Sequence, residues 1–165
     1  MKTILIDPVA QTLTDHEIDG ETLSLQQMYE ALKCDDVQAI NLGTTGPLKI
    51  DLWVNGEGML DINETTRYFV LHTDDKPHNL IAGRGLIAAS NRSLDSVGLP
   101  GHVTAARMEP CIKFIPESQS GAAADLAEQL LDLTTVVGSQ EEMDALMVKS
   151  AAILKQAMML CEVPA

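Results

Sequence analysis

The dipeptide Asn55-Gly56 constrains the fold of this chain more than any other local feature of the sequence. Both central residues of a type I′ turn need a positive φ, and Asn-Gly is a pair that adopts this turn readily. Apolar and polar residues alternate from Leu48 up to the turn, and apolar residues return after it as far as Ile62. Because a period of two places one set of side chains on a buried face, residues 48–63 are predicted to form a central antiparallel hairpin.

Other β-prone segments are separated by the residues that form turns, namely Gly, Pro, Asn and Asp. These segments cover residues 2–6, 11–18, 37–42, 67–71, 80–89 and 111–115. Segment 80–89 is apolar on both faces, which is typical of a fully buried strand. Its two glycines, Gly83 and Gly85, indicate a bulge or a close approach of another backbone.

Three segments have the apolar period of amphipathic helices. The first covers about residues 22–33 and begins at Thr22, a residue type suited to an N-cap. The other two lie after a change of composition near residue 117, at about 122–137 and about 140–161. Since only a short break separates them, they are predicted to form an αα-hairpin.

The last helix has an apolar stripe that must be buried in a core or in a dimer interface. Its members are Met143, Leu146, Met147, Ile153, Leu154 and Met158. The sequence therefore predicts an α+β fold with a mainly antiparallel sheet and one packed helix in residues 1–116. The helical hairpin of residues 117–165 is predicted to pack on this sheet domain or to form a dimer interface.

The chain has a net charge of −13, with 24 acidic and 11 basic residues. A protein this acidic is repelled by phosphate backbones and by anionic membranes, so no direct nucleic-acid or membrane binding is expected. An acidic surface can instead dock on a basic protein. We therefore expect a protein partner, and a basic one.

The sequence also predicts a cytoplasmic location and no cofactor. Its first apolar run is too short for a signal peptide, and no run approaches the roughly 18 apolar residues of a membrane-spanning helix. Its three cysteines have no metal-binding spacing and read as small hydrophobic residues of a reducing compartment.

Trp53 is the first candidate for a binding residue. It lies on the strand face opposite to the alternating apolar residues, and tryptophan is enriched in the energetic centres of protein interfaces. With it we group three charged residues as candidates, namely Asp51, Glu57 and Arg84. In the alternative interpretation, the C-terminal hairpin covers this face and Trp53 belongs to a second core.

A second candidate site lies in the segment from His72 to His78. Two imidazoles and two carboxylates could bind a divalent cation there, through His72, Asp74, Asp75 and His78. No catalytic residue is predicted elsewhere, because the chain has no G-x-S-x-G motif and no other nucleophile signature. The protein is therefore expected not to be an enzyme.

Four short motifs carry a resemblance to a known family. They are Ile4–Pro8, the Leu-Trp-Val-Asn-Gly-Glu-Gly run from Leu52 to Gly58, the Asn63–Thr66 segment and the Ile81–Gly85 segment. On these motifs, residues 1 to about 90 resemble an uncharacterised family of small bacterial, phage and plasmid proteins, a domain of unknown function. The resemblance brings no active site with it and implies a mobile-element setting.

The leading hypothesis is a non-catalytic cytoplasmic binding protein associated with a phage or plasmid. It would dock its acidic surface, or the surface around Trp53, on a host-defence or nucleic-acid-handling protein. Two alternatives stay open. One is a small-molecule binder or metal-assisted hydrolase that uses the His72–His78 segment, and the other is a structural homodimer joined by the C-terminal helices.

Overall fold

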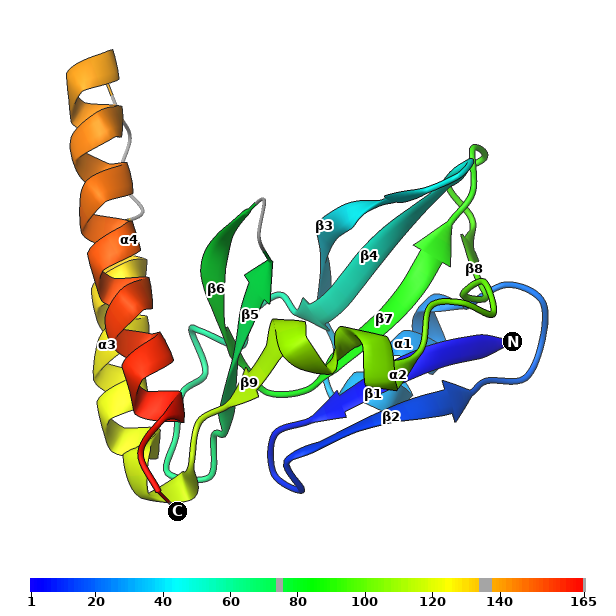
Figure 1. Cartoon of the computed structure of the whole chain (residues 1–165), viewed down its shortest axis with the longest axis horizontal. Coiled ribbons are helices and arrows are strands. Elements are labelled where there is room, and N and C mark those ends of the chain that lie inside the picture. The colour runs from blue at the N-terminus through cyan, green and yellow to red at the C-terminus, as the bar shows by residue number, and fades with distance from the viewer. Residues whose placement is uncertain (74–75, 134–137, 165) are drawn as a thin grey trace. The chain divides into compact units, whose positions relative to one another are not determined.

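The computed structural model describes residues 1–73, 76–133 and 138–164, with only the backbone of residues 76–78, and the chain forms two compact units (Figure 1). Unit 1 comprises Met1–Gly58 and Gly83–Glu109, and unit 2 comprises Met59–Ala82 and Pro110–Ala165. Both units contain antiparallel strands and helices, so the predicted α+β fold is confirmed. The predicted boundary after residue 116 falls inside unit 2.

Unit 1 is built on a six-stranded antiparallel sheet in the order β2-β1-β7-β4-β3, with β8 paired to β7. Its strands are β1 (Lys2–Asp7), β2 (Thr12–Glu17), β3 (Val37–Thr45), β4 (Leu48–Asn55), β7 (Gly85–Ser90) and β8 (Ser96–Val97). The strands predicted at 2–6, 11–18 and 37–42 are therefore confirmed. The alternation predicted for β4 is confirmed as well, because Ile50, Leu52 and Val54 are all buried.

Helix α1 (Leu25–Leu32) packs on one face of this sheet. Its N-cap is Ser24 and not the predicted Thr22. Ser24 is followed three residues later by Gln27, which completes a capping box, whereas the residue three positions after Thr22 is Leu25. The Ser24 hydroxyl accepts from the Gln27 backbone N–H (3.2 Å), and the Gln27 side-chain oxygen accepts from the Ser24 N–H (2.9 Å). Met28 and Leu32 are buried against Leu86 and other residues of the sheet.

The hairpin predicted at Asn55-Gly56 is wrong. The chain turns from β3 into β4 at Gly46, which has a φ of +56°. After Asn55, β4 is followed by turns and not by a strand. Gly56 makes a long-range contact there: its N–H donates to the Asp36 carbonyl (3.2 Å), and an added Cβ would lie 2.0 Å from the end of the Asp36 side chain, which would have to move. Gly56 therefore takes part in a long-range contact, and the Asn-Gly pattern in the sequence does not distinguish this use of glycine from a type I′ turn.

The single buried strand predicted at 80–89 is two strands in two sheets. β6 (Lys76–Ala82) ends in unit 2, and β7 begins at Gly85 in unit 1. Between them Gly83 has a φ of +82°, a conformation that side-chain-bearing residues rarely adopt. The glycines that indicated a bulge instead mark the point where the chain leaves one sheet and enters the other.

Unit 2 has a three-stranded sheet in the order β6-β5-β9, with β5 at Tyr68–Thr73 and β9 at Ile112–Phe114. Helices α3 (Ser120–Asp132) and α4 (Gln140–Cys161) pack together and against this sheet. The predicted residues 134–137 of the first of these helices lie outside the described residues. The remaining short elements are α2 (Ala105–Met108), η1 (Glu109–Cys111) and η2 (Glu117–Gln119).

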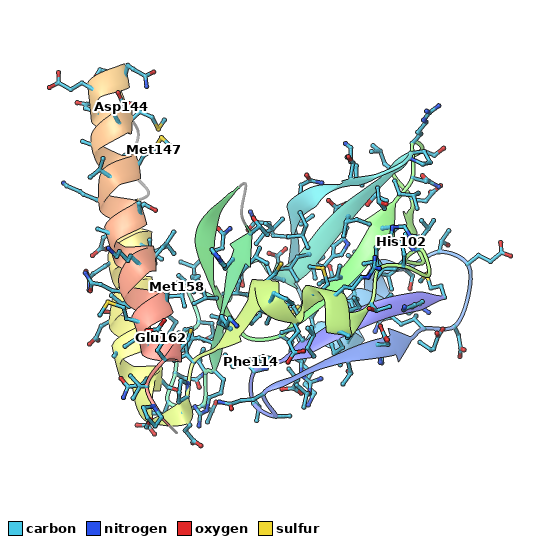
Figure 2. All side chains as sticks on the ribbon, in the orientation of Figure 1. His102, Phe114, Asp144, Met147, Met158 and Glu162 are labelled. Atoms are coloured by element: carbon cyan, nitrogen blue, oxygen red, sulfur yellow. The ribbon has the colours of Figure 1, made fainter. Side chains whose placement is uncertain are left out.

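The apolar stripe predicted on α4 is divided between the core and the surface. Ile153 and Leu154 are buried with strand residues and with α3, and Met158 packs beside them. Nearer the start of the helix, Met143 and Met147 are 43% and 63% exposed, and Leu146 is half-buried. In Figure 2 Met147 and Met158 are labelled toward opposite ends of α4. Among the described residues, the core therefore anchors the second half of the helix.

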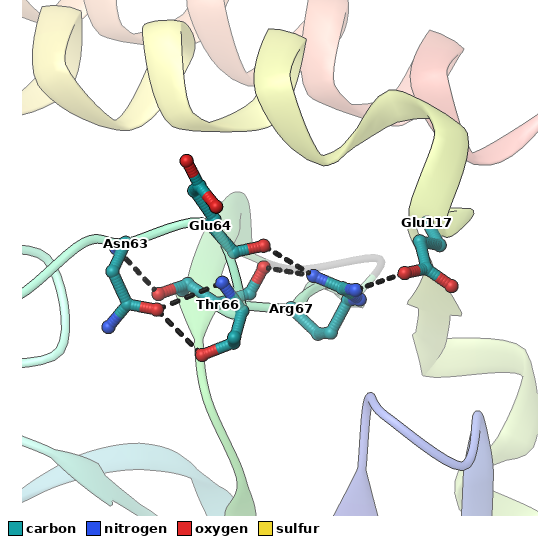
Figure 3. A network of polar contacts seen from close by, with 6 residues as sticks. Asn63, Glu64, Thr66, Arg67 and Glu117 are labelled. Atoms are coloured by element: carbon teal, nitrogen blue, oxygen red, sulfur yellow. Dashed lines mark hydrogen bonds and ion pairs between the residues drawn. The ribbon is translucent and has the colours of Figure 1, made fainter.

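A polar network holds the segment before β5 to the turn before α3 (Figure 3). The Arg67 guanidinium donates to the carboxylate of Glu117 and to the carbonyls of Glu64 (3.1 Å) and Thr66 (3.2 Å). Asn63 closes the adjoining turn, since its N–H donates to the Thr66 hydroxyl (3.0 Å). Because Glu117 is 78% exposed, its ion pair with Arg67 contributes little to the stability of unit 2. The network mainly positions the segment before β5.

Unit 2 is expected to lose stability at high pH. Burial raises the pKa of the Cys161 thiol from 9.0 to about 11, and burial also raises the pKa of the Tyr68 hydroxyl. An unfolded chain releases both protons at lower pH, so the free energy of unfolding should fall as the pH rises from about 9 to about 11. Urea unfolding at pH 8, 10 and 11 measures this fall, and Cys161→Ala should make it shallower. A stability that stays constant over this range would contradict the burial of these groups.

No helix among the described residues is both long enough and apolar enough to cross a membrane.

Candidate binding cavity

A cavity of about 360 Å³ lies on the sheet of unit 1, over strands β3, β4 and β7. It occupies the same face of β4 as Trp53, beyond the part of the sheet on which α1 packs. Its lining combines apolar and polar side chains, which are Ala39, Asn41, Thr44, Lys49, Asp51, Trp53, Ser90 and Leu94. A concave site with a few convergent polar groups is the usual form of a ligand site.

Asp51 is the central polar group of this cavity, and it is only 8% exposed. One carboxylate oxygen accepts from the Asn41 side-chain amide (2.9 Å), and the other accepts from the Ser90 hydroxyl (2.6 Å). Strand register explains this arrangement, since Asn41 is the partner of Asp51 on β3 and Ser90 ends β7 on the other side. Each oxygen retains a lone pair that a further donor can use.

Asp51 takes part in none of the ion pairs formed by the described residues. Both of its donors, Asn41 and Ser90, are neutral, and a buried carboxylate is costly unless a cation compensates it. Lys49 lines the cavity, but it is exposed and forms none of the ion pairs among the described residues. The site is therefore suited to a cationic group that brings its own hydrogen-bond donors.

Trp53 forms one side of the cavity and also packs against the core cluster that contains Met28 and Leu32 of α1. The cluster that fixes the indole thus belongs to unit 1. The indole N–H is buried and has no acceptor among the described residues. An indole held in this way is a rigid wall beside the Asp51 carboxylate.

Of the four predicted binding residues, the structure brings Asp51 and Trp53 together and places the other two elsewhere. Glu57 is exposed in the turn after β4, where its N–H donates to the Asn55 side chain (3.0 Å). Arg84 donates to the Asp7 carboxylate and to the Ala31 carbonyl (3.3 Å), so it joins the β1–β2 turn to the end of α1. Its contacts are those of a structural residue.

Sequence reasoning missed the other six residues of the cavity, and four of them are polar, namely Asn41, Thr44, Lys49 and Ser90. Asn41 and Ser90 are polar residues in strands that the sequence predicts from their apolar residues. The only signal that could have singled them out is the pairing of β3 and β7 with β4, and a sequence alone does not supply that register.

The metal site predicted at His72–His78 stays a prediction. His72 lies near the end of β5, whereas Asp74, Asp75 and the side chain of His78 lie outside the described residues. In the part of the chain that the structure describes, no three His, Cys, Asp or Glu side chains gather in a metal-binding group.

Comparison with known proteins identifies a family but no function. No curated protein and no solved structure matches the chain. One family profile does, described as Domain of unknown function (DUF3846), and it covers residues 1–110. This range contains all of unit 1 together with β5 and β6, and it ends before α3 and α4. Since the profile matches well over half of the sequence, the chain belongs to the DUF3846 family.

Proposed function

We propose that the protein is a non-catalytic binding protein whose cavity receives an arginine side chain of a protein partner. The observation that carries this proposal is the Asp51 carboxylate, which is buried among neutral donors and has no ion-pair partner among the described residues. An incoming guanidinium supplies both the missing charge and the donors for the free lone pairs.

Trp53 favours arginine over lysine as the occupant. A guanidinium is planar and weakly hydrated, so it stacks on an indole while its edge donates to a carboxylate. The cavity of about 360 Å³ places such a wall and such a carboxylate side by side. An ammonium group can pair with Asp51, but it gains less from the adjacent indole.

The charge of the chain supports a basic protein as the partner. A net charge of −13 accelerates association with a basic surface and makes that association sensitive to salt. The resemblance to phage and plasmid proteins suggests a host protein in a mobile-element setting. Defence and nucleic-acid-handling proteins are the proposed class, because their nucleic-acid sites display arginine.

Fluorescence of Trp53 tests the proposal directly, because it is the single tryptophan of the chain. The probes are short peptides of one sequence that carry arginine, lysine or citrulline at the central position. We expect the arginine peptide to change the emission, the lysine peptide to bind more weakly and the citrulline peptide to have no effect. Asp51→Asn should weaken binding by about tenfold to a hundredfold, since it removes a charged hydrogen-bond acceptor.

Two control variants separate the cavity from the general acidity of the surface. Glu57→Gln removes one exposed negative charge outside the cavity, so it should leave the affinity for the arginine peptide unchanged. Lys49→Ala removes the cation at the cavity and should tighten the binding of a cationic group. The opposite pattern, with weaker binding in Lys49→Ala and tighter binding in Asp51→Asn, would contradict a cation site at Asp51. Equal losses in Glu57→Gln and Asp51→Asn would show non-specific attraction.

A further inference from the structure

The outer face of α4 carries a row of residues with the spacing of a coiled-coil seam. Its members alternate at intervals of three and four positions, and all of them are exposed; they are Ala145, Val148, Ala152, Lys155 and Met159. Val148 and Met159 are 71% and 61% exposed. This row differs from the stripe that contains Leu154, which the core of unit 2 covers. Apart from Lys155 the row is apolar, and apolar positions at this spacing pack against a second helix.

From this row we infer that two copies of the chain associate through antiparallel packing of their α4 helices. The seam is narrow and contains two alanines, so a second helix can approach closely at Ala145 and Ala152. In a two-fold arrangement centred on Val148, this residue meets its own copy. Ala145 and Ala152 lie three residues before and four residues after Val148, so Ala145 of each copy then lies within one residue of Ala152 of the other copy, on both sides of the centre.

The charges on α4 fix the antiparallel direction. Glu141 and Lys155 lie seven residues before and seven residues after Val148. An antiparallel pair therefore places Lys155 of each copy beside Glu141 of the other copy, whereas a parallel pair would place Glu141 beside Glu141. Neither residue belongs to an ion pair among the described residues. Both are thus available to a second copy.

One helix face buries less surface than the roughly 800 Å² per partner of a standard stable interface. We therefore expect a dimer with a dissociation constant in the micromolar range.

Sedimentation equilibrium between about 5 and 200 μM protein tests the inference. The wild type should form dimers, and the single charge reversals Glu141→Lys and Lys155→Glu should each weaken association by about tenfold or more. The double variant should restore it, because the complementary pairs are rebuilt in reverse. Val148→Asp should abolish association, and Met147→Gln should leave it unchanged, since Met147 is exposed but lies outside the seam.

Circular dichroism should be used to check that each variant is folded, so that a loss of dimer reports on the interface. A monomeric wild type at 200 μM would overturn the inference. So would a dimer that both single reversals leave intact, because in a parallel pair Glu141→Lys would only exchange one like-charged pair for another. Peptide binding at Trp53 is a separate measurement on unit 1, and its outcome does not depend on this one.

Discussion

Replacing Leu154 with alanine is expected to lower the free energy of unfolding by about 2–5 kcal/mol, the usual cost of a large-to-small change in a core. Leu154 is 6% exposed and packs in the cluster formed by the strands of unit 2, α3 and α4. Deleting most of its side chain removes transfer free energy and leaves a cavity. Urea unfolding followed by circular dichroism measures the loss.

Met147→Ala is the matched control for Leu154→Ala. Met147 was predicted on the same stripe of the same helix, but it is 63% exposed. Its replacement should change the free energy of unfolding by no more than about 0.5 kcal/mol. Equal losses at the two positions would mean that the first half of α4 is packed as firmly as the second, which contradicts the division of the stripe.

Arg84→Met is expected to lower the free energy of unfolding by about 2–3 kcal/mol, because it leaves a partly buried carboxylate without its cation. Asp7 is only 14% exposed, and its other hydrogen bonds come from the backbone N–H groups of Val9 (3.0 Å) and Ala10 (3.2 Å). Arg84 also donates to the Ala31 carbonyl, so its loss also frees the end of α1. Denaturant unfolding of the variant measures the effect.

The exposed ion pair of unit 2 provides the comparison for this partly buried pair of Arg84 and Asp7. Glu117→Gln breaks the pair between Arg67 and a carboxylate that is 78% exposed, so it should cost less than about 1 kcal/mol. Asp7→Asn should cost less than Asp7→Ala, because the amide oxygen can still accept from the turn. A loss in Glu117→Gln as large as that in Arg84→Met would contradict the structural role given to Arg84.

The local pattern of the sequence was sufficient to predict most strands and helices, but not their partners. The alternation in β4 correctly separated Ile50, Leu52 and Val54 from Trp53. The turn was misplaced because Asn55-Gly56 satisfies the local rule for a hairpin, whereas the long-range approach of Asp36 determines how Gly56 is used. Segment 80–89 shows the same limit, since nothing in its composition reveals that Gly83 separates two sheets.

The candidate site was predicted in part for the same reason. Asp51 and Trp53 share a strand face, and a period of two is enough to place them together. Asn41 and Ser90 join them only through the pairing of β4 with a neighbour on each side. Arg84 was selected for its charge, but its contact with Asp7 joins residues far apart in the sequence and could not be read from it.

The interleaved course of the chain, in which residues 59–82 of unit 2 interrupt unit 1, restricts how such a protein can be shortened or recombined. A gene truncated after residue 110 would keep β5 and β6 but lose β9, α3 and α4, so Tyr68 and Val70 would lose the helices that bury them. No single crossover point in the gene would transfer either unit intact. A relative that lacks the two C-terminal helices must therefore cover these strands with some other element.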